Sequence, residues 1–535
     1  MQKLPEAFEV VVVGGTPGGI AAAIAAARHG RSVALVERHT HLGGMSASGL
    51  GKSDIEHKEV IGGLFLDFVS RVRQKYADQF GLDSPDFRLC REGYYYEPSV
   101  AEKVFHEMLA DEGSIHVLNN HQLEQVQVDG RRVVDLDVTN RATGEKRRLA
   151  GKVFIDATYE GDLYAGAGAE FRVGREDRRD FSEPHAGSIY FDYQNGAILP
   201  ESSGRADNHL PAYTYRLCLT TDPDNRFVLQ YPPPEYDRKV YLPYLEDLAA
   251  GRLSAPKVMK DGWGYYPEHF DTLVRALSVT DLPNRKVDAN INPRPLAFPF
   301  AEENRGYVEG TWAQRDAIAL RHRHLTLGLL WFLQNDEAVP EEHRQMAQQY
   351  HLPLDEFVDN GHFPWQLYVR EARRLVGLYT LTEHDVTFSP ESPTTPTYDD
   401  TIAVGEFPID SFPVRKRRPS DRVVLEGYLG MLSHITRPYE IPYRVMIPRQ
   451  VEGLIVPVAI SATHVAYSSV RLEPTWMALG HAAGLAAHLA IRDQVPLRSV
   501  SMPDLRALLA SEGQVLRHTP PIAAASEEPL RRACS

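Results

Sequence analysis

The sequence has few cysteines and no long apolar run. Only three cysteines occur among 535 residues, Cys90, Cys218 and Cys534, and no two of them have C-x-x-C spacing. This usage excludes a disulfide framework and favours a reducing compartment. No stretch reaches the roughly 20 uninterrupted apolar residues of a spanning helix, and the first residues do not resemble a secretory signal. We therefore expect a cytoplasmic protein with no membrane partner.

Positive charge and metal-ligand spacing are also lacking. The formal net charge of −14 repels nucleic acids and anionic membrane surfaces. His322 and His324 are two residues apart and would face different sides of a helix, and His343 and His351 have no partner at ligand spacing. There is no G-x-S-x-G nucleophile motif either. We expect a small-molecule substrate, no metal ion and no nucleic-acid partner, while monomer and homo-oligomer both stay open.

What the sequence does contain is a βαβ unit at its start. The chain is 43% hydrophobic and long enough for two or three core-bearing units. Residues 8–13 form a β-branched run typical of a buried parallel strand, and residues 18–30 predict an alanine-rich helix that ends at Gly30. Residues 32–37 predict the second strand.

The glycine segment between the first strand and the helix runs GGTPGG, from Gly14 to Gly19. In the pattern G-x-G-x-x-G, Thr16 stands where a glycine lets the backbone approach a pyrophosphate. Gly18 still lets the helix begin near a ligand, and a helix N-terminus attracts anions. Thr16 fits if its side chain turns away or donates to a phosphate. Glu37, 23 residues after Gly14, suits a ribose hydroxyl, so we predict a dinucleotide site with a variant turn.

Further elements follow along the chain. The sequence predicts an antiparallel pair turning at Asp129 and Gly130, then a strand at residues 151–158. The composition shifts toward Pro, Tyr and Asp from about Phe181 to Asp288, which indicates a separate substrate or cap region. Helical patterns follow at residues 307–334 and 364–381, and a polar tail begins at Arg517.

A resemblance to a known family is carried by six segments that lie in order across about residues 8–515. They are EPSVAEKVF at Glu97, FIDATYEGDLYAGAGAEFRVGRE at Phe154, PAYTYRLCLT at Pro211, LPNRKVDAN at Leu282, LYVREARRLVG at Leu367 and SATHVAYSSVRLEPTWMALGHAAGLAA at Ser461. Together they resemble the FAD-dependent oxidoreductases of the glutathione-reductase superfamily, in the group often labelled xanthan-lyase-related.

The resemblance implies an α/β protein, a Rossmann-like FAD/NAD(P)-binding fold with an inserted α+β substrate or cap domain. The FAD-binding domain would be discontinuous, with residues 1–180 as its first part and 401–516 as its closing part. Residues 181–400 would form the cap, and 517–535 a flexible tail.

The resemblance also implies which residues contact FAD. The glycine segment would take the pyrophosphate, Glu37 and Arg38 the adenosine, and the Gly43–Met45 loop would pass phosphate and flavin; Gly43 and Gly44 as simple turn residues stay the alternative. The full set is Gly14, Gly15, Thr16, Gly18, Gly19, Glu37, Arg38, Gly43, Gly44, Met45, Val126, Ala157, Thr158, Asp162, Pro474, Met477 and Gly480. A covalent link to FAD through His41 stays open.

The segment LEPTWMALGHAAGLAAHLAI predicts a helix with Pro474 in its first turn. In this superfamily such a helix points its N-terminus at the flavin pyrimidine ring. Its positive end would stabilise the negative charge that develops when flavin takes a hydride. The small residues, Gly480 among them, would also suit helix packing.

His464, Arg471 and Glu473 come just before this helix and are the candidate catalytic residues. His464 would take a proton from a substrate hydroxyl or amine as hydride leaves, or it would only bind backbone in a loop. Arg471 would clamp a substrate anion or neutralise reduced flavin, or it would pair with Glu473.

In LYVREARR, the residues Tyr368, Arg370 and Glu371 resemble a family motif, and we favour a charge network that holds the cap to the flavin domain. The family often shows DSH where this chain has Asp410, Ser411 and Phe412. This departure puts a direct transfer of mechanism in doubt.

The function predicted from these observations is oxidation of a CH–OH or CH–NH group of a small polar substrate, with carbohydrate derivatives as one candidate class, by hydride transfer to the N5 atom of noncovalent FAD. A flavin monooxygenase is one alternative, for which Glu160 to Asp162 give faint support. A nonredox protein with structural FAD, linked to polysaccharide metabolism, is the other.

Overall fold

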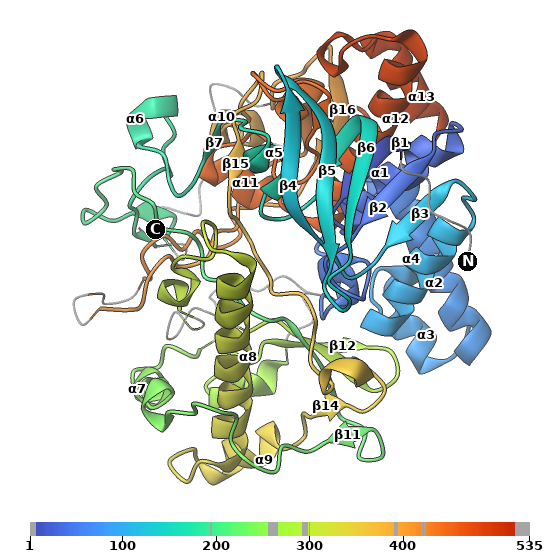
Figure 1. The fold of residues 1–535 in the computed structure, drawn as a ribbon. Coiled ribbons are helices and arrows are strands. Elements are labelled where there is room, and N and C mark those ends of the chain that lie inside the picture. Colours follow the sequence, from blue (N-terminus) through green and yellow to red (C-terminus); the bar gives the residue numbers. More distant parts are fainter. Residues whose placement is uncertain are drawn as a thin grey trace.

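The fold is organised around one mixed sheet. In this computed structural model residues 7–192, 195–254, 266–291, 298, 300–389, 394–418, 421 and 424–518 are described. The sheet has the strand order β3-β2-β1-β6-β5-β4, and β18 also pairs with β6. Figure 1 shows it in blue and cyan in the upper part of the molecule. Its strands are β1 (Ala7–Val13), β2 (Val33–Val36), β3 (Ile115–Leu118), β4 (His121–Asp129), β5 (Arg132–Asn140), β6 (Lys146–Asp156) and β18 (Leu454–Ile455).

The βαβ unit predicted at the start of the chain is confirmed. Strand β1 pairs in parallel with β2 and with β6, so that Val11 lies opposite Ala34 and Phe154. Between β1 and β2 runs helix α1 (Pro17–Arg28), and Gly30 beyond it has a φ of 77°. Only glycine adopts that conformation without strain, as expected of a residue that ends a helix. The valine run is fully buried because both faces of the strand are covered.

Two further sequence predictions are confirmed beside this unit. Strands β4 and β5 form an antiparallel pair in which Asp129 lies opposite Arg132. Strand β6 ends at Asp156, so Ala157 and Thr158 follow the strand instead of belonging to it. The last strand, β18, pairs in parallel with residues of β6 that lie 300 positions earlier in the chain, so a segment near the end of the sequence completes the sheet.

The C-terminal part of the chain packs on α1. Helix α12 (Glu473–Asp493) crosses α1 closely: a Cβ at Gly480 would overlap the carbonyl oxygen of Gly18, and one at Gly484 would overlap that of Ala22. The small residues of both helices therefore set their separation. Nearby helices are α2 (Gly63–Phe80), α3 (Pro85–Leu89), α4 (Pro98–Ala110), α11 (His464–Val470) and α13 (Met502–Ser511).

The middle of the chain forms smaller elements, which Figure 1 shows in green and yellow below the sheet. A three-stranded sheet has the order β10-β13-β12, and the long helix α8 begins at a Thr311 capping box. The remaining elements are β10 (Leu217–Thr220), β11 (Arg226–Phe227), β12 (Val279–Leu282), β13 (Lys286–Ala289), β14 (Leu352–Pro353), α7 (Pro243–Ala249), α8 (Trp312–Asn335) and α9 (Glu341–Ala347).

Short elements connect these two regions. They are α5 (Asp162–Gly166), α6 (Arg178–Phe181), α10 (Glu383–Val386), β7 (Phe171–Arg172), β8 (Phe191–Asp192), β9 (Ala197–Ile198), β15 (Arg374–Leu375), β16 (Thr401–Gly405) and β17 (Tyr439–Pro442). No helix of the described residues is long and apolar enough to cross a membrane.

One predicted helix is wrong. Residues 364–381 contain no helix and only the two-residue strand β15. The reason lies in side chains that the helical pattern ignores: Arg370 and Arg374 are fully buried, and Arg374 pairs with Glu371 and Glu176. An extended chain lets these charges reach partners on other segments. The predicted tail lies outside the described residues from residue 519 onward.

Candidate active site

The turn before α1 shows how a threonine fits the glycine segment. Thr16 is the N-cap of α1, its Oγ1 accepts a hydrogen bond from the Gly19 N–H at 3.1 Å, and the hydroxyl donates to the Ala157 carbonyl at 2.9 Å. Its φ is −69°, so no glycine is required at this position. The sequence left two possibilities, a side chain turned away from the phosphate or one that donates to it. In the structure the Thr16 hydroxyl donates to Ala157, so the side chain is turned away and caps the helix. Pro17 has no N–H and the Gly19 N–H is taken by Thr16, so within the first turn of α1 the Gly18 N–H stays available for an anion.

The four glycines of the same segment are held by close contacts. Gly14 has a φ of 103°, and a Cβ at Gly15 would lie 2.6 Å from Leu42. A Cβ at Gly19 would overlap the Gly14 carbonyl, and one at Gly18 would lie 3.0 Å from the Trp476 carbonyl of α12. The glycines thus let β1, α1 and α12 converge.

Glu37 stands at the rim of a pocket at the end of β2. The pocket measures about 790 Å³, counted with the space open to solvent, and Gly14, Thr16 and Glu37 all line it. The Glu37 carboxylate accepts hydrogen bonds from the Gly15 and His39 N–H groups, both at 2.7 Å. Burial raises the pKa of this carboxyl to about 7 against the opposing effect of these two bonds. The Glu37 carboxylate faces the start of α1. In a dinucleotide whose pyrophosphate bound at the start of α1, the ribose hydroxyls would lie near this carboxylate.

Arg38 and Trp312 form one wall of this pocket. The Arg38 guanidinium lies 4.5 Å from the Trp312 ring and donates to Asp316 on α8 at 2.8 Å. Val126, on β4, does not line the pocket; it borders a neighbouring hollow together with Asp162. The side of the pocket next to Glu37 is therefore closed by α8, from the middle of the chain.

The loop of Gly43, Gly44 and Met45 approaches the glycine turn from the other side. The Gly43 N–H donates to the Gly15 carbonyl at 2.7 Å. Gly43 and Gly44 have positive φ angles of 96° and 49°. The Met45 N–H donates to the Tyr159 hydroxyl, which in turn donates to Glu473 Oε1 at 2.7 Å. Tyr159 thereby connects this loop to the first turn of α12.

Thr158 and Asp162 follow β6 and also line the pocket. The Thr158 hydroxyl donates to Asp156 and accepts from the Asp162 N–H at 3.1 Å. The Asp162 carboxylate is held by Arg315 at 2.7 Å and by Arg373 at 2.9 Å. Asp162 therefore binds two arginines of later segments.

The first turn of α12 carries buried polar atoms without partners. Pro474 is in this turn, as predicted, and the buried Met477 lies one turn on. Among the described residues nothing bonds Glu473 Oε2, Thr475 Oγ1 or Trp476 Nε1. Burial raises the pKa of Glu473 to about 8, with Asp54 adding to it and the Tyr159 hydrogen bond opposing it. Buried polar groups are normally bonded, so these three atoms have hydrogen-bonding capacity that the described residues leave unused.

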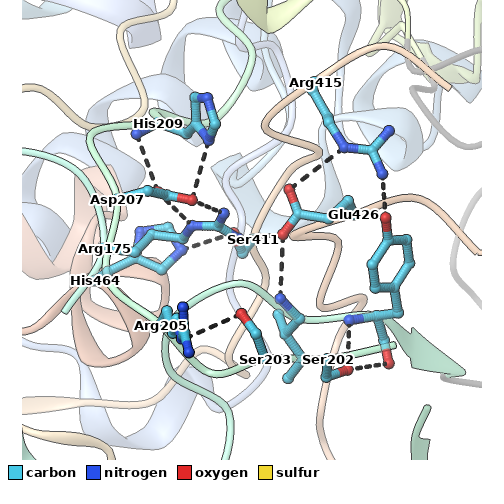
Figure 2. A network of polar contacts seen from close by, with 12 residues as sticks. Arg175, Ser202, Ser203, Arg205, Asp207, His209, Ser411, Arg415, Glu426 and His464 are labelled. Atoms are coloured by element: carbon cyan, nitrogen blue, oxygen red, sulfur yellow. Dashed lines mark hydrogen bonds and ion pairs between the residues drawn. The ribbon is translucent and has the colours of Figure 1, made fainter. Parts of the chain in front are cut away.

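His464 is the first residue of α11 and is buried. Its Nδ1 lies 2.7 Å from Glu371 Oε2, and its Nε2 lies 3.3 Å from Ser411 Oγ (the latter contact is drawn in Figure 2). The Glu371 carboxylate fixes the tautomer with the proton on Nδ1, so Nε2 is the nitrogen that accepts a proton. Both His464 contacts are made by side chains, while its backbone N–H donates to Glu176 at 2.9 Å.

Arg471 ends α11 and does not pair with Glu473, which corrects one alternative from the sequence. It donates to the Tyr368 hydroxyl at 2.9 Å and to the Asp410 carbonyl at 2.7 Å. Glu473 instead takes the Tyr159 hydroxyl. The pairing fails because the N-cap, Leu472, separates a side chain at the end of one helix from one at the start of the next.

A separate network of polar contacts is drawn in the same view as His464 and Ser411. Figure 2 shows Arg175 bonded to Asp207, and Asp207 in turn to His209, together with the pair of Glu426 and Arg415. Elsewhere, Glu102 and Asp359 lie 2.8 and 2.9 Å from the two ring nitrogens of His41, so these contacts oppose the covalent link to FAD that the sequence left open. No cluster of three or more metal-ligating side chains occurs in the described ranges.

Sequence reasoning missed several contributors. Tyr159 follows the DAT segment directly, so its position next to predicted FAD-contact residues could have indicated a role in the site. Trp312 and Arg315 had none, because they reach the pocket from α8, about 150 residues beyond Asp162. Ser411 entered the sequence analysis only because Phe412 beside it replaces the histidine of the family's DSH pattern.

Comparison with known proteins adds a family match. The chain matches the family model described as FAD dependent oxidoreductase over residues 9–509. No curated protein matches the sequence. Similar solved structures include THI4 of Thermovibrio ammonificans, with 24% identity, coverage of 32% of this chain and 66% of that one, and a TM-score of 0.22.

Two other similar solved structures are a dehydrogenase and a monooxygenase. The glycerol-3-phosphate dehydrogenase of Bacillus halodurans complexed with FAD is 16% identical, with coverage of 39% and 46% and a TM-score of 0.22. The p-nitrophenol 4-monooxygenase PnpA of Pseudomonas putida DLL-E4 is 18% identical, with coverage of 32% and 47% and a TM-score of 0.22. The chain spans less than two thirds of each of these three structures.

Proposed function

Because the chain belongs to the family of FAD-dependent oxidoreductases, we propose that it oxidises a CH–OH or CH–NH group of a small polar molecule. The cofactor is FAD, and the fold is the Rossmann-like FAD-binding fold. A carbohydrate-derived substrate is the class that the resemblance to xanthan-lyase-related members favours, and sugars and polyols therefore come first among test compounds.

The residues present fit FAD. The N-terminus of α1 offers the Gly18 N–H and the positive end of the helix dipole to a pyrophosphate, beside the pocket that Glu37 lines. The first turn of α12 offers Thr475 Oγ1 and Trp476 Nε1, which are buried and have no partner among the described residues. We propose Gly14 to Gly19 for the pyrophosphate, Glu37 for the ribose and the α12 turn for the flavin ring. When bound, FAD accepts the electron pair and the hydrogen of a substrate C–H bond.

The buried pair of His464 and Glu371 is the observation that carries the reaction class. Loss of hydride makes the substrate O–H or N–H strongly acidic, and a base within hydrogen-bond reach removes that proton. Nε2 of His464 is free to accept it because Glu371 holds Nδ1–H. Ser411 Oγ lies 3.3 Å from the same nitrogen, and we propose that the substrate hydroxyl or amine takes the place of this contact.

The test is reduction of the bound flavin without oxygen. The purified holoenzyme is mixed anaerobically with sugars, polyols, hydroxy acids and amino compounds, and the flavin absorbance is followed. Direct bleaching by one of these compounds supports the proposal. Reduction by NADH or NADPH alone indicates a monooxygenase, and no reduction by either kind of donor indicates structural FAD; both results contradict the proposal.

A further inference from the structure

Arg370 is a fully buried arginine that forms no ion pair with any of the described residues. Its side chain has no exposed surface, and Nη1 donates to the Ala212 carbonyl at 2.8 Å. Nε and Nη2 have no partner within the described part of the chain. Buried charges are normally paired because an unpaired one is costly. By contrast, the buried Arg374 has two carboxylates, Glu176 and Glu371. The unused donors of Arg370 therefore need a separate explanation.

The two unused donors lie on one edge of the guanidinium. The N–H of Nε and one N–H of Nη2 are parallel, and this edge matches the two oxygens of a carboxylate. The plane is held by two rings: the guanidinium carbon is 4.2 Å from the centre of Tyr368 and 3.7 Å from that of Phe412. With both rings this close to the guanidinium, the edge of Nε and Nη2 is the direction in which Arg370 can bind a ligand.

The position of Arg370 connects it to the candidate catalytic residues. Arg471, which precedes α12, donates to the hydroxyl of the same Tyr368. Phe412, which covers Arg370, is preceded by Ser411, which contacts His464. One loop thus touches both the unpaired arginine and the proposed base. A ligand group bound by Arg370 would lie close to a group that His464 deprotonates.

We propose that Arg370 binds the carboxylate of the substrate, so that the substrate is a hydroxy acid or an amino acid. This inference rests on the proposed function and narrows its substrate class, with sugar acids as the carbohydrate-derived members. In the reaction the C–H bond next to the hydroxyl or amine breaks and its electron pair leaves with the hydrogen to FAD. The O–H or N–H proton passes to His464. The substrate becomes a keto or imino acid, and FAD is reduced.

The electrostatics of Arg370 agree with this role. Burial lowers its pKa to about 9, and the neighbouring cations Arg471 and Arg216 lower it as well, while Tyr368 and Asp410 act in the opposite direction. A carboxylate on the free edge would supply the missing counter-charge. Arg471, in contrast, already has Asp410 within 3.8 Å.

The experiment compares ligands that differ only in this charge. The holoenzyme is titrated with lactate against lactamide, alanine against alaninamide and gluconate against gluconamide, and binding is followed by calorimetry and by the flavin spectrum. At least one carboxylate should bind about 10- to 100-fold more tightly than its amide, the scale of a charge-assisted hydrogen bond. Arg370→Met should remove this preference. Arg437→Met, at an exposed arginine stacked on Phe388, should keep it.

Further outcomes would overturn the inference. Removing an unpaired buried charge should leave the melting temperature of Arg370→Met equal to or above that of the wild type; a variant that does not fold would make Arg370 structural. Loss of FAD from Arg370→Met would assign the arginine to the cofactor, and equal binding by inorganic phosphate would exclude carboxylate selectivity. Neutral polyols that reduce both proteins equally would contradict this inference and leave the proposed function intact. Carboxylate preference without flavin reduction would contradict only the proposed function.

Discussion

Glu371 holds His464 in one orientation: its Oε2 lies 2.7 Å from the imidazole Nδ1, and Arg374 binds its Oε1 at 2.8 Å. Glu371 is therefore a positioning residue, anchored on one side and directing a base on the other. We expect Glu371→Gln to slow flavin reduction about tenfold or more while the FAD content stays unchanged. When Glu371→Gln is combined with His464→Asn, the reduction rate should be almost the same as with His464→Asn alone, because Glu371 and His464 act together as one hydrogen-bonded pair.

The measurement is a double-mutant cycle of flavin reduction rates. The exposed Glu145 of a surface turn, changed to Gln, serves as control and should reduce at the wild-type rate. Additive effects of the Glu371 and His464 changes would show that Glu371 acts only on structure.

Thr16 should matter through its hydroxyl. Thr16→Val keeps the shape and removes both the cap of α1 and the bond to Ala157, so we expect the free energy of unfolding to fall by about 1 kcal/mol. Thr16→Ser retains the hydroxyl and should lie close to the wild type. Urea denaturation of the three proteins tests this, and a valine variant as stable as the serine variant would refute it.

Gly480 should not tolerate even one methyl group. A Cβ there would overlap the Gly18 carbonyl, and forced separation of α1 and α12 costs about 1–3 kcal/mol. We expect Gly480→Ala to lower both the melting temperature and the FAD affinity. Gly113→Ala is the matched control because nothing lies within 4 Å of its added Cβ. Equal behaviour of the two variants would contradict the packing described.

Glu473 should make the FAD-free protein less stable as pH rises. Its pKa in the folded state is about 8, well above its ordinary value, so from about pH 5 to pH 8 the folded state binds more protons than the unfolded chain. Stability then decreases with increasing pH. Melting temperatures across this range should fall less steeply in Glu473→Gln, while Glu145→Gln follows the wild type. A Glu473→Gln curve parallel to the wild type would exclude this titration.

Local patterns were enough to predict the first unit of the fold. The valine run, the glycine turn and Gly30 act through backbone geometry within 30 residues, and their structure follows from that geometry. The same reasoning fails at residues 364–381, where apolar spacing suggested a helix. Arg374 also pairs with Glu176, and Glu371 with His464, both on distant segments, and Arg370 is enclosed by Phe412 from another segment, so no local pattern reveals these contacts.

The candidate site also contains features that local patterns predict and features that they do not. The place of Glu37 after β2 and of Pro474 in the first turn of α12 could be predicted because each is fixed by its own element. The contacts of Asp162 with Arg315 and of His464 with Glu371 join segments 153 and 93 residues apart. Only the folded chain brings such side chains together, so the spacing of residues along the sequence could not reveal them.

The most direct test of the account is anaerobic stopped-flow reduction of the wild type and of His464→Asn by a compound that bleaches the wild-type flavin. The account predicts an unchanged flavin spectrum and FAD content, with reduction slowed by at least about a hundredfold. The defect should shrink at high pH, where hydroxide partly replaces the base. His209→Asn, at an exposed histidine, should reduce normally. A His464→Asn variant whose flavin is reduced at the wild-type rate would contradict the assignment of His464 as the base.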